Sequence, residues 1–273
     1  MNIVYAILVL GIMGAVFGLL LALASRVFAV EQDERLEPLT ECLPGANCGG
    51  CGYAGCSAYA QAVLNGEAKV GGCVAGGAAV AEKMSEILGV EAEETERLVA
   101  SVRCRGTDAA QKARYAGLQD CMAATKVTGN GPQLCSYGCL GFGNCVKACQ
   151  FGALSIQDGI ARVDREKCVG CFACIEACPR GVIIKTPYEA KTLVPCSSKD
   201  KGPAVRKACS VGCIGCKMCE RACQFDAIHV TDNLAAIDYT KCTGCGACIA
   251  KCPRKLITDA QLRRPEEQQA KAV

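Results

Sequence analysis

The chain has 273 residues, of which 25 are cysteine and 30 are glycine, while tryptophan is absent and aromatic residues make up only 5%. This composition excludes one large conventional core and a short secreted disulfide scaffold, and it predicts small modules organised around bound metal. The formal charge of +3 gives no support for a nucleic-acid partner, because metal-bound thiolates would bring the loaded chain to roughly −7.

Residues 1–25 are predicted to form a transmembrane anchor. The run from Ile3 to Ala24 is uncharged and apolar, and at about 1.5 Å per residue it is long enough to cross roughly 30 Å of hydrocarbon. A cleaved signal peptide is the alternative, but it would need a basic start, which this sequence lacks. The first charge after the run is Arg26, so the positive-inside rule predicts that the following residues lie in the cytoplasm, where thiols stay reduced.

After an acidic linker over residues 26–40, residues 41–100 carry the first cysteine motif, with the spacing C-x2-C-x4-C-x16-C. Its members are Cys48, Cys51, Cys56 and Cys73. A glycine-rich loop that brings backbone N–H groups close to sulfur favours a four-iron cluster, while zinc sites more often use two C-x2-C knuckles. A short helix is expected from Ser57 to Leu64, and an amphipathic helix pair with a solvated acidic face over residues 78–99.

The second half of the chain contains an internal repeat of 74 residues. Residues 135–180 and 209–254 are identical at 24 of 46 positions without a gap, and all eight cysteines of the first copy fall on cysteines of the second. Each copy resembles a two-cluster bacterial ferredoxin, in which the fourth cysteine of each run ligates the other cluster. The segments about Asp158-Gly159 and Asp232-Asn233 are predicted to form β-hairpins with tight turns.

The two predicted ferredoxin-like domains, residues 135–185 and 209–257, differ in one ligand. In the second domain, one cluster is assigned Cys213, Cys216, Cys219 and Cys252, and the other Cys242, Cys245, Cys248 and Cys223. In the first domain, Phe142 stands where the second has Cys216, so Cys135 is the expected substitute. That gives one set of Cys135, Cys139, Cys145 and Cys178, and another of Cys168, Cys171, Cys174 and Cys149. If Cys135 does not reach, the first of these sites would hold three irons.

These sets use twenty cysteines for five clusters, which leaves Cys42, Cys104, Cys121, Cys196 and Cys209. Four of them lie in or beside the connecting segments, residues 101–134 and the basic connector 186–208. They either form a sixth cluster or are ordinary buried thiols; the candidate set is Cys104, Cys121, Cys196 and Cys209.

His229 is expected to face solvent on a hairpin strand, and residues 258–273 are expected to form a polar tail. The expected fold is α+β: one transmembrane helix, a small four-iron cluster domain and tandem two-cluster ferredoxin-like domains.

Taken in order, the uncharged anchor, the C-x2-C-x4-C-x16-C motif and the paired ferredoxin motifs resemble the B subunit of the Rnf-type ion-translocating ferredoxin:NAD oxidoreductase complex. The first motif also resembles a small domain of some corrinoid-pathway proteins. The resemblance extends to Lys255. It implies a relay of electrons from soluble reduced ferredoxin to flavin and iron-sulfur subunits in the membrane, whose redox step drives sodium or proton export.

Two other functions stay open at this point. One is a membrane-tethered polyferredoxin that serves a hydrogenase or a corrinoid-activating enzyme, and the other is a zinc scaffold for protein interaction. The chain has no G-x-G-x-x-G after a predicted strand and no flavin-attachment motif. Nicotinamide and flavin chemistry is therefore expected on partner subunits, with no complete catalytic site on this chain.

Overall fold

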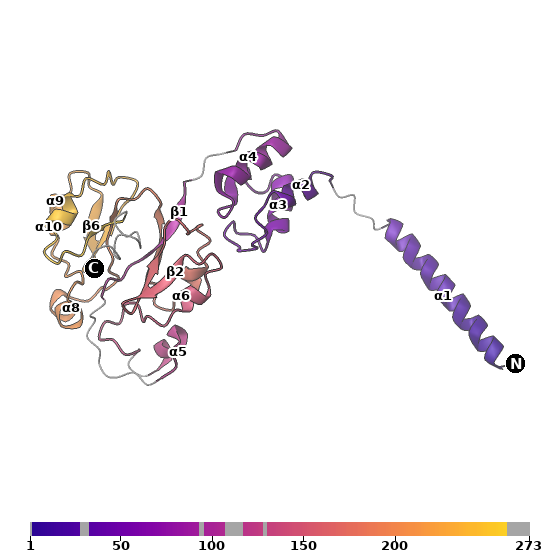
Figure 1. The fold of residues 1–273 in the computed structure, drawn as a ribbon, viewed down its shortest axis with the longest axis horizontal. Coiled ribbons are helices and arrows are strands. Elements are labelled where there is room, and N and C mark those ends of the chain that lie inside the picture. The colour runs from indigo at the N-terminus through magenta and orange to yellow at the C-terminus, as the bar shows by residue number, and fades with distance from the viewer. Residues whose placement is uncertain (1, 28–32, 93–95, 107–116, 128–129, 261–273) are drawn as a thin grey trace, which may run out of the picture.

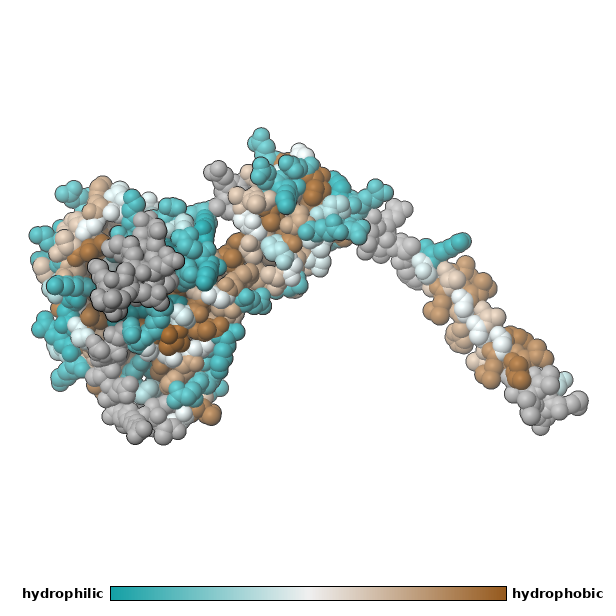
Figure 2. Space-filling view, viewed as in Figure 1, coloured by the Kyte–Doolittle hydropathy of each residue, from teal (hydrophilic) through white to brown (hydrophobic). Residues whose placement is uncertain are grey.

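The computed structural model describes residues 2–27, 33–92, 96–106, 117–127 and 130–260. Helix α1 (Asn2–Val27) stands apart from the rest of the protein (Figure 1). Its stretch Ile7–Arg26 has a mean hydropathy of 2.7 and none of it is buried, and Figure 2 shows mostly apolar residues, with paler ones between them, on the visible side of the helix. A helix that is apolar all round and packs against nothing is suited to a membrane rather than to water.

The first domain is helical and has its own core. Its elements are α2 (Leu36–Glu41), α3 (Cys56–Leu64), the 3₁₀ turn η1 (Val70–Gly72) and α4 (Gly77–Leu88). Tyr59 is fully buried with Leu39 and Met84, and its hydroxyl donates to the carbonyl of Lys69 at 2.6 Å and accepts the N–H of Gly72 at 3.0 Å. The helix expected from residue 57 is confirmed as α3.

The expectation of a helix pair over residues 78–99 is half wrong. Helix α4 ends at Leu88, where Gly89 adopts a left-handed conformation, as is usual after a helix C-terminus. Residues 93–95 lie outside the described part of the chain, and strand β1 (Leu98–Val102) begins where the second helix was expected to end. Its short apolar run, with buried Val99 and Val102, pairs along its whole length with a strand of the next domain.

Each ferredoxin-like module is built on a hairpin with short helices beside it. The first module contains α6 (Asn144–Lys147), β2 (Leu154–Gln157), β3 (Ile160–Val163) and α7 (Ala173–Glu176). The second contains α9 (Met218–Ala222), β6 (Ile228–Thr231), β7 (Leu234–Ile237) and α10 (Ala247–Lys251). Positive φ angles at Asp158 and Gly159, and at Asp232 and Asn233, confirm the two tight turns predicted from the sequence.

Two further strand pairs join the modules to the segments that precede them. Strand β1 pairs antiparallel with β4 (Ile183–Pro187), and β5 (Thr192–Leu193) pairs with β8 (Thr258–Asp259). In register, Ser101 faces Ile184 and Leu193 faces Thr258. Because Ile184 and Thr258 are 74 residues apart, Ser101 and Leu193 occupy equivalent places in the two modules although neither belongs to the repeat.

Two short helices complete the described part of the chain. Helix α5 (Cys121–Lys126) lies before the first module, and α8 (Gly202–Ala208) lies between the modules. The predicted connecting segments therefore have regular structure: α5 lies within residues 101–134, and β5 and α8 lie within residues 186–208. The hydrophobic core of each module includes buried cysteines. Hairpin side chains, such as Ile160 in the first module and Ile228 in the second, pack together with these thiols.

Candidate iron-sulfur sites

Three cavities are each lined by all four members of a cysteine set assigned from the sequence. The first domain holds one such cavity and the second ferredoxin-like module holds two. They enclose about 330, 350 and 340 Å³ of empty space, part of it open to solvent. The sets that line them are Cys48, Cys51, Cys56 and Cys73; Cys213, Cys216, Cys219 and Cys252; and Cys223, Cys242, Cys245 and Cys248.

Asn47 orders the loop of the first site. Its side-chain Oδ1 accepts the N–H of Cys56 at 2.8 Å, at the start of α3. Gly50, on the same loop, lies against the next domain: an ideal Cβ there would be 2.9 Å from the Cα of Cys171. The loop that carries Cys48 and Cys51 is thus packed directly on the cysteine loop of the first ferredoxin-like module.

Cys149, Cys168, Cys171 and Cys174 lie together in the first module. The pKa of the Cys174 thiol is raised to about 12, first by burial and then by the neighbouring thiols of Cys168, Cys171, Cys145 and Cys149. The N–H of Ala100, on strand β1, donates to Sγ of Cys168 at 3.4 Å. Strand β1 therefore supplies the kind of N–H···S hydrogen bond that tunes a bound cluster.

At the remaining site of this module, the structure brings together Cys139, Cys145 and Cys178. The pKa of Cys145 is raised to about 12, first by burial and then by the neighbouring thiols of Cys139, Cys178 and Cys121. The N–H of Ala161 donates to Sγ of Cys139 at 3.4 Å. Cys121 is thus a thiol neighbour of Cys145, while Cys135, the fourth member predicted from the sequence, lines another cavity.

Cys135 instead lines a fourth cavity, between the two modules. Burial raises its pKa, and its thiol neighbours in that shift are Cys104 and Cys209. The cavity encloses about 380 Å³, and its thiols are those of Cys104, Cys135, Cys196 and Cys209. The candidate sixth set thus has three of its four members together here, while Cys121 lies at the Cys139 site.

Cys42 lies away from these cavities. It follows helix α2, packs at the edge of the first domain's core, and its Sγ donates to the carbonyl of Leu39 at 3.1 Å. Burial raises the pKa of this thiol. Cys42 has the surroundings of an ordinary structural cysteine.

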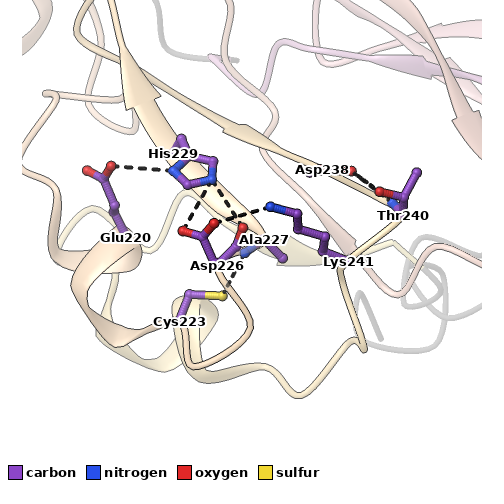
Figure 3. A network of polar contacts seen from close by, with 8 residues as sticks. All are labelled: Glu220, Cys223, Asp226, Ala227, His229, Asp238, Thr240 and Lys241. Atoms are coloured by element: carbon purple, nitrogen blue, oxygen red, sulfur yellow. Dashed lines mark hydrogen bonds and ion pairs between the residues drawn. The ribbon is translucent and has the colours of Figure 1, made fainter.

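His229 faces carboxylates and solvent (Figure 3). Its Nδ1 lies 3.7 Å from Oε1 of Glu220 and its Nε2 lies 3.5 Å from Oδ1 of Asp226, which also pairs with Lys241 at 3.2 Å. The side chain is 45% exposed, so the prediction of a solvent-facing histidine is confirmed.

Cys223, drawn in the same view, accepts the N–H of Ala227 through Sγ at 3.4 Å.

The donor set fits clusters better than single ions. In the described part of the chain, no group of three or more His, Cys, Asp or Glu side chains is placed to hold one metal ion. Four thiolates on one zinc, with bonds of about 2.3 Å, would converge to about 4 Å from one another. Here four thiols line each of the three cavities, and at Cys223 a backbone N–H group points at sulfur, which suits a four-iron cluster.

Comparison with known families gives matches in the same three regions. Residues 43–75 match the family described as "Putative Fe-S cluster", residues 160–183 a 4Fe-4S binding domain, and residues 212–258 a 4Fe-4S dicluster domain. These matches place iron-sulfur domains along the chain in the expected order.

Relatives with established names match nearly the whole chain. The B subunit of the Na(+)-translocating ferredoxin:NAD(+) oxidoreductase complex of Acetobacterium woodii is 43% identical over 92% of this chain and 76% of its own length. The B subunit of the ion-translocating oxidoreductase complex of Methanosarcina acetivorans is 44% identical over 92% of this chain and 96% of its own. The B subunit of the proton-translocating ferredoxin:NAD(+) oxidoreductase complex of Clostridium ljungdahlii is 44% identical over 100% and 99%.

Proposed function

Since the chain belongs to the family of B subunits of Rnf-type ion-translocating ferredoxin:NAD oxidoreductase complexes, we propose that it takes electrons from reduced soluble ferredoxin and passes them to flavin and iron-sulfur partner subunits. It is an electron-relay subunit with 4Fe-4S domains. The observation that carries the proposal is the set of cavities that are each lined by four thiols. When bound there, four-iron clusters supply one-electron chemistry that no side chain offers.

The proposal includes at least five clusters. Three use the cavity-lining sets of the first domain and the second module, and a fourth uses Cys149, Cys168, Cys171 and Cys174. The fifth is bound by Cys139, Cys145 and Cys178 with one further thiol. The polypeptide holds the thiols in place, buries some of them, such as those of Cys145 and Cys174, and directs N–H groups such as those of Ala100 and Ala161 at sulfur.

Close packing between domains supports a relay rather than separate storage sites. Gly50 of the first domain touches the backbone of Cys171 in the first ferredoxin-like module. Ligand loops of two successive sites are therefore in van der Waals contact, which is what short-range electron transfer between them needs. The proposal keeps the expected order of domains but moves their boundaries. Strand β1, which begins within residues 41–100, pairs with the first ferredoxin-like module, and β8, which begins the segment expected to be a polar tail, pairs with β5.

The membrane arrangement belongs to the same proposal. Helix α1 is long and apolar enough to span a bilayer, and the subunit is associated with a membrane complex. Because Arg26 is at its C-terminal end, the positive-inside rule supports cluster domains on the cytoplasmic side. Reduced thiols for cluster assembly are maintained in that compartment.

Anaerobic purification from native membranes, with metal analysis and identification of the attached subunits, tests this function. The expected result is a brown protein that copurifies with the other subunits of the oxidoreductase complex and is reduced by ferredoxin. A colourless protein without acid-labile sulfide would overturn the relay. Copurification with a hydrogenase or a corrinoid-activating enzyme instead would keep the relay and overturn the assignment of its partners.

A further inference from the structure

We propose that a sixth four-iron cluster lies between the two ferredoxin-like modules, bound by Cys104, Cys135, Cys196 and Cys209, and that Cys121 completes the site of Cys139, Cys145 and Cys178. The inference rests on the proposed relay and deepens it, because this cluster would connect the modules. It exchanges the places that the sequence alone assigned to Cys121 and Cys135.

The cavity between the modules has the size and lining of the other three cysteine-lined cavities. It encloses about 380 Å³, against about 330 to 350 Å³ for the others. An ideal Cβ on Gly138 would lie 3.5 Å from Sγ of Cys135 and 3.7 Å from Sγ of Cys104. The equivalent Cβ on Gly212 would lie 3.7 Å from Sγ of Cys209. Both glycines thus lie in van der Waals range of these sulfur atoms, and at Gly212 an added Cβ would collide with Cγ1 of Val205 at 2.5 Å.

The two modules contribute matching pairs of thiols. Cys135 and Cys209 are equivalent in the 74-residue repeat. Cys104 and Cys196 lie outside the repeat, but each follows by three residues a strand position, Ser101 or Leu193, that occupies the same place in its module. The two modules thus contribute equivalent pairs of thiols to the site, which has four thiols from this one chain. Four ordinary buried thiols would have no reason to be placed in this way.

Arginine side chains support the same cavity from both modules. Nη1 of Arg180 donates to the carbonyls of Cys135 and Gly138, each at 2.9 Å, and Nη2 of the equivalent Arg254 donates to the carbonyl of Cys209 at 2.8 Å. The Nε atoms of both arginines are buried and have no hydrogen-bond partner among the described residues. Arg254 lines the cavity of Cys213, Cys216, Cys219 and Cys252. The two arginines therefore act on the cavity between the modules through the backbone carbonyls that they bind.

Cys121 is held beside the other site by a specific pair of side chains. Asn144, the residue before Cys145, accepts the N–H of Cys121 through Oδ1 at 2.9 Å and donates through Nδ2 to Asp120 at 2.7 Å. Asp120 in turn caps helix α5 by accepting the N–H of Ala123 at 2.8 Å. The helix therefore begins with its cysteine fixed against the cysteine loop of the module. Phe142, which stands where the second module has Cys216, packs against the buried residues Cys121, Ala124 and Leu140.

The cavity between the modules adjoins a ligand of each of them. On one side, the thiol of Cys104 is among the neighbours that raise the pKa of Cys139, after burial itself. On the other side, the N–H of Cys213 donates to Sγ of Cys196 at 3.4 Å. An electron that enters the first module can therefore reach the second through ligands in contact, with one electron accepted and one passed on at each site and no bond made or broken.

Iron and acid-labile sulfide counts on the anaerobically isolated full-length protein test the sixth cluster without any substitution. We expect about 24 irons and a similar number of sulfides per chain, as six four-iron clusters require. A count of about 20 would overturn the sixth cluster and leave the proposed relay intact, whereas a colourless protein would overturn both.

Serine variants then test the exchange of ligands. The double variant Cys104→Ser/Cys196→Ser is expected to lose about one sixth of the iron, and the control Cys42→Ser none. Added to the double variant, Cys135→Ser should cause no further loss. Added to the same background, Cys121→Ser should remove about one more iron and produce the EPR signal of an oxidised three-iron cluster. If Cys135→Ser rather than Cys121→Ser gives that signal, the exchange is wrong.

Discussion

Gly50 and Cys171 are in direct contact although they belong to different domains. An ideal Cβ on Gly50 would lie 2.9 Å from the Cα and 3.3 Å from the Cβ of Cys171. The thiol of Cys48, two residues before Gly50, is also among the neighbours that raise the pKa of Cys171, after burial itself. The first domain is therefore positioned on the first ferredoxin-like module by the loops that carry their ligands.

Replacing Gly50 with alanine should separate these two loops without emptying either site. The added methyl group would collide with backbone atoms of Cys171, which cannot move aside as a flexible side chain can. We expect unchanged iron content, weaker magnetic coupling between the two reduced clusters in EPR spectra, and a severalfold slower ferredoxin-dependent reduction of NAD by the assembled complex.

Val74 provides the matched control for this variant, because its side chain would lie 2.6 Å from the same added Cβ. Val74→Ala alone should leave the coupling unchanged. In the double variant Gly50→Ala/Val74→Ala, the collision with Cys171 persists, so the loss should persist as well. Full recovery in the double variant would show that Val74, and not the contact between domains, accounts for the effect.

The pair Asp120 and Asn144 gives a second prediction. Asn144→Ala removes the acceptor for the N–H of Cys121 and the donor to Asp120, so the thiol of Cys121 is no longer fixed beside Cys145. We expect a loss of about one iron per chain and a three-iron EPR signal in the oxidised protein. Thr125→Ala is the control on the same helix, since its hydroxyl bonds only the carbonyl of Met122. Equal signals from both variants would contradict the role of the pair.

Cysteine spacing and the 74-residue repeat predicted most of the iron-sulfur sites. They gave the two hairpins, and three of the assigned sets line cavities. The places of Cys121 and Cys135 were not predictable from spacing, because they depend on a contact between Asp120 and Asn144 and on a cavity formed by both modules. One signal was available: Cys209 is not needed within its own module, and Cys135 is its equivalent in the repeat.

Strand β1 shows a second reason why sequence-based prediction of the fold was incomplete. Its apolar run is short, and periodicity alone does not separate a strand from a helix at that length. The conformation is settled by β4, which lies more than eighty residues further along the chain and pairs with β1 from Leu98 to Val102. Ser101 and Thr186 add a buried hydroxyl contact of 2.6 Å between the two strands.

Removal of α1 gives a third prediction. No residue of its membrane-spanning stretch is buried in the protein, so the helix contributes nothing to the packing of the cluster domains. A chain that starts at residue 33 should therefore be recovered from the soluble fraction with its full iron content, and fractionation with metal analysis measures both. A truncated protein that stays with membranes stripped of the partner subunits would argue against α1 as the anchor.

Arg180 gives the last prediction, which concerns reduction potential. Burial lowers the pKa of its guanidinium, while the thiols of Cys135, Cys139, Cys104 and Cys121 act in the opposite direction. The side chain therefore lies among thiols of the Cys139 site and of the cavity between the modules. Its positive charge should favour the reduced, more negative form of a bound cluster.

Arg180→Gln should accordingly lower the midpoint potential of the neighbouring clusters by tens of millivolts, where roughly 60 mV corresponds to 1.4 kcal/mol for one electron. Arg180→Lys keeps the charge but not the paired hydrogen bonds to Cys135 and Gly138, so its shift should be smaller. Redox titration followed by EPR measures both variants at equal iron content. Equal shifts in the two variants would assign the effect to the hydrogen bonds alone, and a rise in potential in Arg180→Gln would contradict the electrostatic argument.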